Sequence, residues 1–127
     1  MTSRRQARRQ ALFLVYQWDL SGSPLGSQFA GEIDPWAFEL AEETVAKAAA
    51  FDVRITAAAE GWTAERLGAV ERSALRVAIC ELDRGAVPPE VVINEAVAHT
   101  KRYASEQGAR LVNGILGAVQ RAQAVGR

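Results

Sequence analysis

The sequence has one cysteine, Cys80, and one histidine, His99, in 127 residues. A lone cysteine cannot form an intramolecular disulfide, and no cysteine or histidine cluster is present to hold zinc. We therefore expect a protein of a reducing compartment that carries no metal and no cofactor. We expect Cys80 to be an unreactive thiol and His99 a surface imidazole. No residue set supplies both a nucleophile and a base, so the chain is not expected to be an enzyme.

Long apolar runs are also missing. No segment approaches the roughly 20 apolar residues that a membrane span requires. Basic residues precede an apolar stretch near the start, as in a signal peptide, but Tyr16, Gln17, Trp18 and Asp19 interrupt that stretch. No convincing small-residue cleavage site follows. We therefore expect a cytoplasmic protein with no membrane association.

The apolar residues that are present predict an all-α fold. Hydrophobic residues make up 49% of the chain, alanine dominates, and β-branched residues occur only in short clusters. Capping residues and apolar periodicity predict six or seven helices, with residues 22–33 as a loop. The expected helices are Ser3 to about Leu20, Asp34 to Glu60 with a break near Phe51-Asp52, Thr63 to Leu67, Val70 to Asp83, one from Pro88-Pro89, and one from Ser105.

The predicted helix from Val70 to Asp83 has a second row of residues opposite its main apolar face. Ser73, Val77, Cys80 and Arg84 follow each other at helical spacing on that side. Such a row contacts either a second layer of the same fold or a protein partner. We favour the second layer.

Charge is balanced overall but unevenly distributed. Residues 1–20 have four arginines against one aspartate, and residues 91–127 have five basic against two acidic side chains. Residues 31–60 have seven acidic against two basic side chains. If the basic ends meet in space, they form a patch suited to phosphate.

Four arginines occupy the first turns of the first predicted helix. Arg4 and Arg8 are four residues apart, as are Arg5 and Arg9. Like charges at this spacing repel, and cations at a helix N-terminus oppose the helix dipole. A bound polyanion would offset that cost. The alternative is a solubilising or frayed helix end.

A second basic segment joins the last two predicted helices. Residues 101–110 combine cations with Tyr103 and with side-chain amide chemistry. Proteins that bind single-stranded RNA use such mixtures, in which aromatic rings stack on bases and cations hold phosphates. The alternative is that Tyr103 completes the buried stripe of its own helix.

Three stretches together resemble the bacterial transcription antitermination factor NusB family. They are RRQARRQALFLVYQWDLSG, LGAVERSALRVAICEL and VPPEVVINEAVAHTKRYASEQGARLVNGIL. The resemblance implies a single RNA-binding domain over residues 1–127, built as two packed three-helix subdomains of about 1–67 and 68–127. It implies binding to boxA-type single-stranded RNA in ribosomal transcripts, together with the ribosomal protein NusE. It further implies a link to the RNA polymerase elongation complex through other Nus factors.

The resemblance also implies roles for individual residues. Tyr103 would stack on a base, and Glu71 matches an acidic position at the family's ribosomal-protein interface. Gln107-Gly108-Ala109 replaces a turn that is usually acidic, and the loss of an acid should favour phosphate binding. The implied RNA-binding residues are Arg4, Arg5, Arg8, Tyr16, Lys101, Tyr103, Ser105, Glu106, Gln107 and Arg110.

Two other functions stay open at this point. The chain could be a protein-interaction module that self-associates, for example as a homodimer. It could also be an RNA-binding accessory to a ribosomal-RNA-modifying enzyme carried by another chain.

Overall fold

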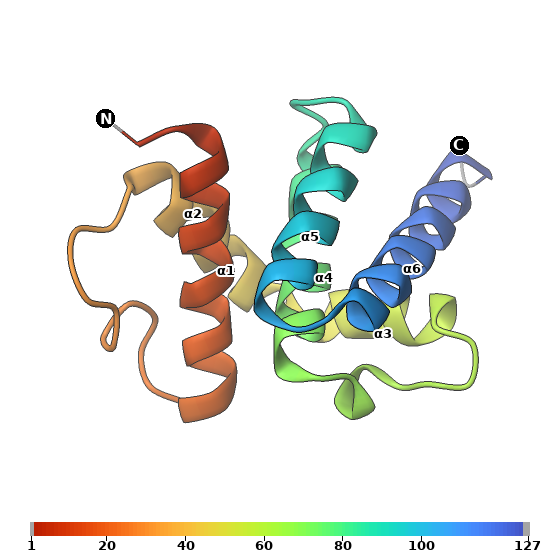
Figure 1. Cartoon of the computed structure of the whole chain (residues 1–127), viewed down its shortest axis with the longest axis horizontal. Coiled ribbons are helices and arrows are strands. Elements are labelled where there is room, and N and C mark those ends of the chain that lie inside the picture. Colours follow the sequence, from red (N-terminus) through yellow and green to blue (C-terminus); the bar gives the residue numbers. More distant parts are fainter. Residues whose placement is uncertain (1, 126–127) are drawn as a thin grey trace.

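The computed structural model describes residues 2–125 and contains within them six α-helices, one short 3-10 helix and no strand. The all-α prediction is confirmed. Figure 1 shows α1, α5 and α6 toward the viewer, with α2 and α3 farther back. The elements are α1 (Arg4–Ser21), α2 (Pro35–Ala46), α3 (Ala48–Ala58), η1 (Ala64–Arg66), α4 (Ala69–Arg84), α5 (Pro89–Tyr103) and α6 (Glu106–Val125).

Several helices begin and end where the sequence supplies capping residues. The Ser3 side chain accepts a hydrogen bond from the Gln6 backbone, and the Gln6 side chain accepts one from the Ser3 backbone. The Asp34 carboxylate accepts two backbone hydrogen bonds from the first turn of α2. Gly22 and Gly85 follow α1 and α4 with φ values of 69° and 66°, a left-handed conformation that favours glycine. These predicted boundaries are confirmed to within about one residue.

The region after α2 differs from the prediction. The break lies at Lys47, between α2 and α3, and not near Phe51-Asp52. Lys47 has φ −109° and ψ 11°, and the turn there lets Phe51 enter the core, where it is 3% exposed. The residues around Lys47 are mostly alanine, so no glycine or proline marks the turn. Thr63 forms no side-chain cap, and the segment after it makes only one 3-10 turn.

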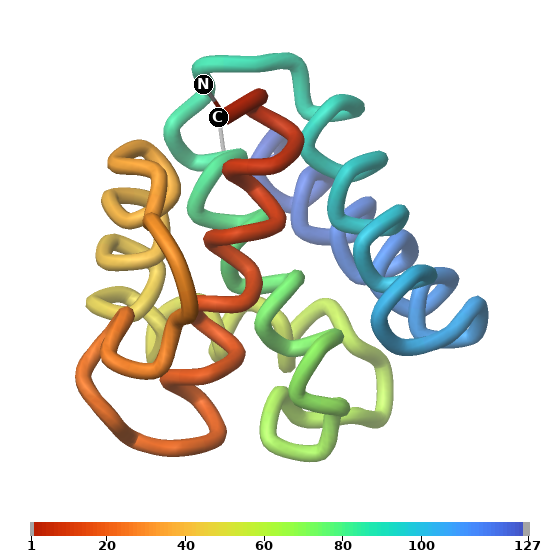
Figure 2. The backbone as a smooth tube through the Cα atoms, turned by 60° about the vertical axis from the view of Figure 1, so that its left-hand side comes forward, coloured from red at the N-terminus to blue at the C-terminus, as the bar shows by residue number. Residues whose placement is uncertain are grey.

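Helix α4 occupies the centre of the molecule. It packs against each of the other five α-helices, and every residue from Ser73 to Glu81 is buried. Figure 2 shows α2 on one side of α4 and α5 and α6 on the other, with α1 passing in front of α4. In the second row, Val77 and Cys80 are covered by neighbouring helices, and Arg84 pairs with Glu43 of α2. The preference for a second layer of the same fold is confirmed.

One hydrophobic core extends through both halves of the chain. It includes Leu14 of α1, Leu40 of α2, Leu75 of α4 and Leu116 of α6, all fully buried. The division into two three-helix subdomains stays a prediction, because α4 packs against helices of both halves. None of the helices in residues 2–125 is long and apolar enough to cross a membrane.

Candidate nucleic-acid interface

Helices α1 and α5 lie side by side and run in the same direction (Figures 1 and 2). Arg5 Nε donates to Glu95 Oε1 at 3.2 Å, and the rings of Phe13 and Tyr103 meet edge to face at 4.9 Å. Both pairs are separated by 90 residues in the sequence. The parallel register therefore places the arginine-rich start of α1 alongside the middle of α5, about one turn before the basic residues of α5.

A surface groove lies between these two helices, and we call it the α1/α5 groove. Arg5 and Arg9 contribute cations from α1, and Arg102 contributes one from α5. Across residues 2–125, neither Arg9 nor Arg102 forms an ion pair. Their charges are therefore available to an anion in the groove. The groove is lined by Arg5, Gln6, Arg9, Glu95, Ala98, His99, Arg102 and Tyr103.

The sole histidine also lines the α1/α5 groove. His99 is half-buried and lines a surface groove, which is compatible with the expected surface position. Burial lowers the pKa of His99, and the nearby positive charges of Arg9 and Arg5 lower it further, while Glu95 acts in the opposite direction. The imidazole is therefore mainly neutral at pH 7, and the cationic character of the groove comes from its arginines.

The aromatic side chains meet at the far end of the groove. Tyr103 is half-buried against Phe13, and the Arg102 guanidinium lies 5.4 Å from the Tyr103 ring centre. Tyr103 thus both completes the buried stripe of α5 and borders the groove, so the two interpretations of this residue are compatible. Tyr16 lies on the same side of α1 as Arg5, one turn beyond Phe13, and does not line the groove.

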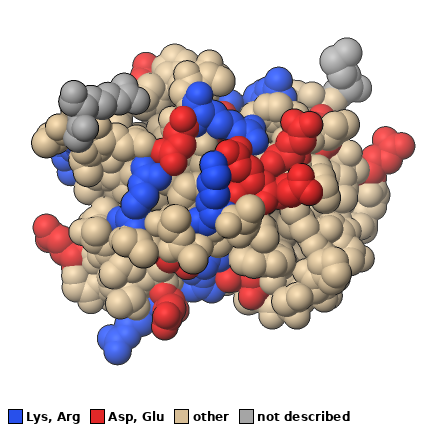
Figure 3. Space-filling model, turned by 180° about the vertical axis from the view of Figure 1, so that it is seen from behind, with Lys and Arg blue, Asp and Glu red and all other residues tan. Residues whose placement is uncertain are grey.

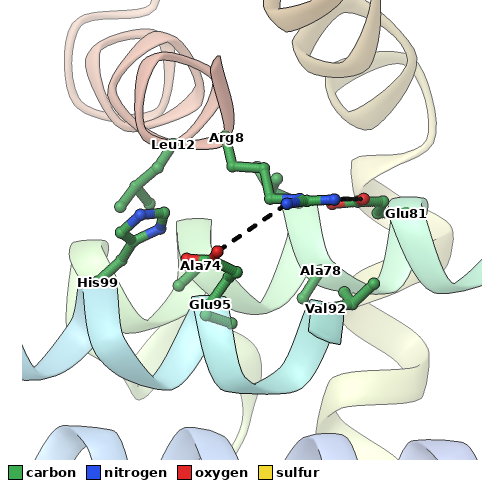
Figure 4. Close-up of a pocket in the computed structure, with 10 residues that line it drawn as sticks. Arg8, Leu12, Ala74, Ala78, Glu81, Val92, Glu95 and His99 are labelled. Atoms are coloured by element: carbon green, nitrogen blue, oxygen red, sulfur yellow. Dashed lines mark hydrogen bonds and ion pairs between the residues drawn. The ribbon is translucent and has the colours of Figure 1, made fainter. Parts of the chain in front are cut away.

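The other two arginines of the first turns face away from the groove. The Arg4 guanidinium stacks over Trp36 of α2 at 4.2 Å from the ring centre. Arg8 is only 7% exposed, and its Nε and Nη2 atoms donate to Glu81 of α4 at 2.8 and 2.7 Å (Figure 4). The hydrogen bond to Glu81 raises the pKa of Arg8 despite its burial.

This geometry corrects the role expected for Arg8. Its guanidinium is occupied inside the protein and is closed off from a phosphate at the surface. We assign Arg8 instead to the packing of α1 on α4. The four arginines therefore divide into a pair that lines the groove, Arg5 and Arg9, and a pair that does not, Arg4 and Arg8, of which only Arg8 is buried.

The turn between α5 and α6 places its polar residues on a different side. The Ser105 hydroxyl accepts a hydrogen bond from the Gly108 backbone at 2.9 Å, which caps α6 as predicted. Lys101 pairs with Glu106 at 3.6 Å, and both line a second groove between α5 and α6 together with Arg110. Gln107 is exposed in the first turn of α6. The structure therefore brings Tyr103 to α1 and leaves the other implied turn residues around the end of α5.

Glu71, the position implied for the protein partner, lies near the same turn. It is half-buried in the first turn of α4. A Cβ atom added to Gly108 would lie 3.1 Å from Glu71 Oε2, so the carboxylate is close to the start of α6. Only a residue without a side chain fits there without displacing Glu71.

The opposite face of the molecule has a different charge pattern. Figure 3 shows acidic side chains gathered right of its centre, with basic side chains beside them and no broad basic area. Among described residues of α2, α3 and α4, ion pairs join Arg54 to Asp83 and Arg84 to Glu43, and Lys47, which follows α2, also pairs with Glu43. Paired charges attract a polyanion weakly, so this face is a poorer candidate for RNA than the α1/α5 groove.

Comparison with known proteins agrees with this arrangement. The family model described as "NusB family" matches residues 5–121. The chain belongs to the NusB family. A curated NusB relative from Solibacter usitatus, a transcription antitermination protein, is 39% identical over 95% of this chain and 90% of its own length. The solution structure of NusB from Aquifex aeolicus superposes with a TM-score of 0.81 at 32% identity, covering 99% of this chain and 93% of that one.

A further solved NusB structure contains partners. It is a crystal structure of the antitermination factors NusB and NusE in complex with double-stranded RNA. It superposes with a TM-score of 0.73 at 33% identity, covering 94% of this chain and 96% of that one. The NusB-like, all-helical fold expected from the sequence is thus confirmed, and the expectation of a non-enzymatic protein agrees with curated relatives that are antitermination proteins.

The implied RNA-binding residues include Arg5 and Tyr103 of this NusB-family groove but not the other six that line it, among them Arg9, Glu95, His99 and Arg102. Arg9 belongs to the N-terminal arginine cluster, and its spacing of four from Arg5 is a sequence signal for a shared helix face. His99 and Arg102 are three residues apart on one side of α5. Their approach to α1 depends on the parallel register of the two helices, which sequence periodicity does not encode.

Proposed function

We propose that this NusB-family chain is a transcription antitermination factor that binds boxA-type single-stranded RNA in ribosomal transcripts together with NusE. The observation that carries the proposal is the α1/α5 groove, which is lined by Arg5, Arg9 and Arg102 and has the ring of Tyr103 at one end. Cations neutralise phosphates, and an aromatic ring offers a stacking surface to an unpaired base.

The proposal extends to residues around the end of α5. Lys101 and Arg110 would hold phosphates of the strand as it leaves the groove, and Ser105, Glu106 and Gln107 would meet base edges. Tyr16 would contact the strand beyond Phe13, and Arg4 would supply a peripheral charge. Glu71 would face NusE. Through NusE and other Nus factors, the complex would join the RNA polymerase elongation complex in the cytoplasm.

Fluorescence anisotropy tests the proposal. A short boxA-like RNA and a scrambled RNA of equal length are titrated with the protein, with and without NusE, at two salt concentrations. We expect tighter binding to the boxA-like strand and a further gain with NusE. Equal, weak, salt-sensitive binding to both strands would refute sequence-specific recognition. The self-association hypothesis, tested by mass measurement across concentration, would then move ahead.

Variants locate the binding surface. Arg9→Ala and Arg102→Ala should each weaken binding and reduce the slope of log affinity against log salt by about 0.7, the value for one phosphate contact on a single strand. Arg66→Ala is the matched control, because Arg66 is an exposed arginine of η1 outside the groove. Equal effects of all three substitutions would show that binding is diffuse and that the groove is not the site.

A further inference from the structure

A chain of alternating charges runs from the centre of the molecule to the α1/α5 groove. Glu81 of α4 binds Arg8 through three hydrogen bonds of 2.7–3.0 Å, and Arg8 Nη1 lies 4.0 Å from Glu95 Oε1. The same Glu95 oxygen accepts the hydrogen bond from Arg5 Nε. Figure 4 shows the Arg8 guanidinium between the two carboxylates. Exposure rises along this chain, from a 4% exposed Glu81 side chain to a 79% exposed Arg5 side chain.

Arg5 uses one of its three guanidinium nitrogens inside the protein and leaves the other two available to a ligand. Glu95 is bonded to Nε alone, and within the described part of the chain the two Nη groups of Arg5 have no hydrogen-bond partner. The Glu95 side chain is 14% exposed and lies between the positive charges of Arg5 and Arg8. An exposed arginine normally loses side-chain conformational freedom when it binds a ligand. Here the hydrogen bond from Nε to Glu95 already restricts the Arg5 guanidinium before a ligand binds.

We propose that Glu95 is a positioning residue that holds Arg5 in place to receive an RNA phosphate. The inference deepens the proposed function and rests on it. Glu81 holds Arg8, the positive charge of Arg8 attracts the nearby Glu95 carboxylate, Glu95 accepts the hydrogen bond from Nε of Arg5, and the two Nη groups of Arg5 meet the phosphate. A residue that touches no RNA thereby contributes to RNA affinity.

Simple electrostatics makes the opposite prediction for Glu95. A carboxylate in a groove that binds a polyanion repels it, so removal of the charge should strengthen binding. Positioning and repulsion therefore change the affinity in opposite directions. Glu95→Ala removes the charge and the acceptor together. Glu95→Gln removes the same charge but keeps an oxygen that can accept the hydrogen bond from Arg5, so the two variants differ in the acceptor and not in net charge.

The test is the RNA affinity of these two variants in the anisotropy assay, each in the wild-type and in the Arg5→Ala background. We expect Glu95→Ala to bind RNA about two- to tenfold more weakly than Glu95→Gln, the usual effect of leaving one long side chain to be ordered on binding. In the Arg5→Ala background the two variants should bind equally. Glu90→Ala, which removes an exposed carboxylate from the first turn of the same helix, controls for charge and should not weaken binding.

The outcomes separate the inference from the function on which it rests. Equal affinities of Glu95→Ala and Glu95→Gln in the wild-type background would overturn the positioning role, as would a difference that persists without Arg5. Failure of the wild-type protein to bind RNA would overturn the proposed function as well. Arg5 can also be followed by the NMR signal of its Nε–H group. This signal should become mobile in Glu95→Ala and stay ordered in Glu95→Gln, whereas a merely structural Glu95 would leave it unchanged in both.

Discussion

Removal of one partner from the buried Arg8–Glu81 pair should strongly destabilise the fold. Glu81→Ala would leave the Arg8 guanidinium inside the protein with its three hydrogen bonds to Glu81 removed. The remaining carboxylate, Glu95, lies at 4.0 Å and is too distant to replace them. The variant therefore has a buried charge with incomplete compensation.

The expected cost follows from the burial of both partners. Their side chains are 8% and 4% exposed, so water screens the pair weakly and cannot solvate Arg8 in the variant. Removal of one partner from such a pair costs about 3–5 kcal/mol. For a domain of this size that corresponds to a fall in Tm of roughly 10–20 °C. Since domains are commonly stable by about 5–15 kcal/mol, the variant would lose a large share of its stability.

Urea denaturation followed by circular dichroism measures this loss. Asp83→Ala is the control, because it breaks the Arg54–Asp83 pair, whose side chains are 31% and 36% exposed. That pair should contribute no more than about 1 kcal/mol. A Glu81→Ala cost as small as that of Asp83→Ala would refute the reasoning. It would mean that Arg8 reaches solvent, and Arg8 would then return to the candidate phosphate contacts.

A double variant tests the same point from the other direction. Arg8→Met combined with Glu81→Leu replaces both charges with apolar side chains, and such replacements are often neutral or stabilising. We expect a folded protein with most of the stability of the wild type. If the slope of log RNA affinity against log salt fell in this double variant by about 0.7, the value for one phosphate contact, Arg8 would be shown to contact RNA directly.

Three further predictions concern other parts of the molecule. Burial alone would raise the pKa of Asp19, but hydrogen bonds and charge from Arg72 and Arg76 lower it below the ordinary value of 3.8. The ionised Asp19 therefore stabilises the folded protein above about pH 4, and this contribution is lost as the pH falls. Asp19→Asn should reduce stability at pH 7 and flatten the acid branch of a pH titration of unfolding; an unchanged acid branch would contradict this. Gly114 lies within α6 with open space around its Cα atom, so Gly114→Ala should add about 0.5–1 kcal/mol of stability, whereas Gly85→Ala at φ 66° should destabilise in the same urea assay. Arg4→Ala should reduce RNA affinity less than Arg5→Ala, because Arg4 stacks on α2; equal losses would restore Arg4 as a direct contact.

Local chemistry made most of the helix boundaries predictable. Ser3, Asp34 and Gly85 each act on backbone groups within a few residues, so their effects can be identified without knowledge of the tertiary structure. The break at Lys47 was not predictable in this way. It serves to direct Phe51 into the core, and the local sequence lacks a residue that terminates a helix.

The candidate site was only partly predictable for a related reason. The arginine cluster and Tyr103 could be selected by residue type, but their partners could not. Arg8 follows Ala7 on the buried side of α1, and its burial requires an acidic residue on another helix. Glu81 lies within the long buried segment of α4. A carboxylate among apolar neighbours is rarely buried without a partner, so Glu81 was the sequence signal that a buried cation such as Arg8 could pair with it. Which of the four arginines line the groove depends on helix packing, which residue spacing alone does not determine.

The parallel pairing of α1 with α5 has a consequence for synthesis of the chain and for its unfolding. The two walls of the groove are 90 residues apart, so a ribosome must complete most of the polypeptide before both walls exist. An N-terminal fragment ending before α5 would have the arginines of α1 without their opposing surface. A ligand held between the two walls would favour the intact fold over partly unfolded forms that separate α1 from α5. At a hundred times its Kd, such a ligand would add about 2.7 kcal/mol to the free energy of unfolding.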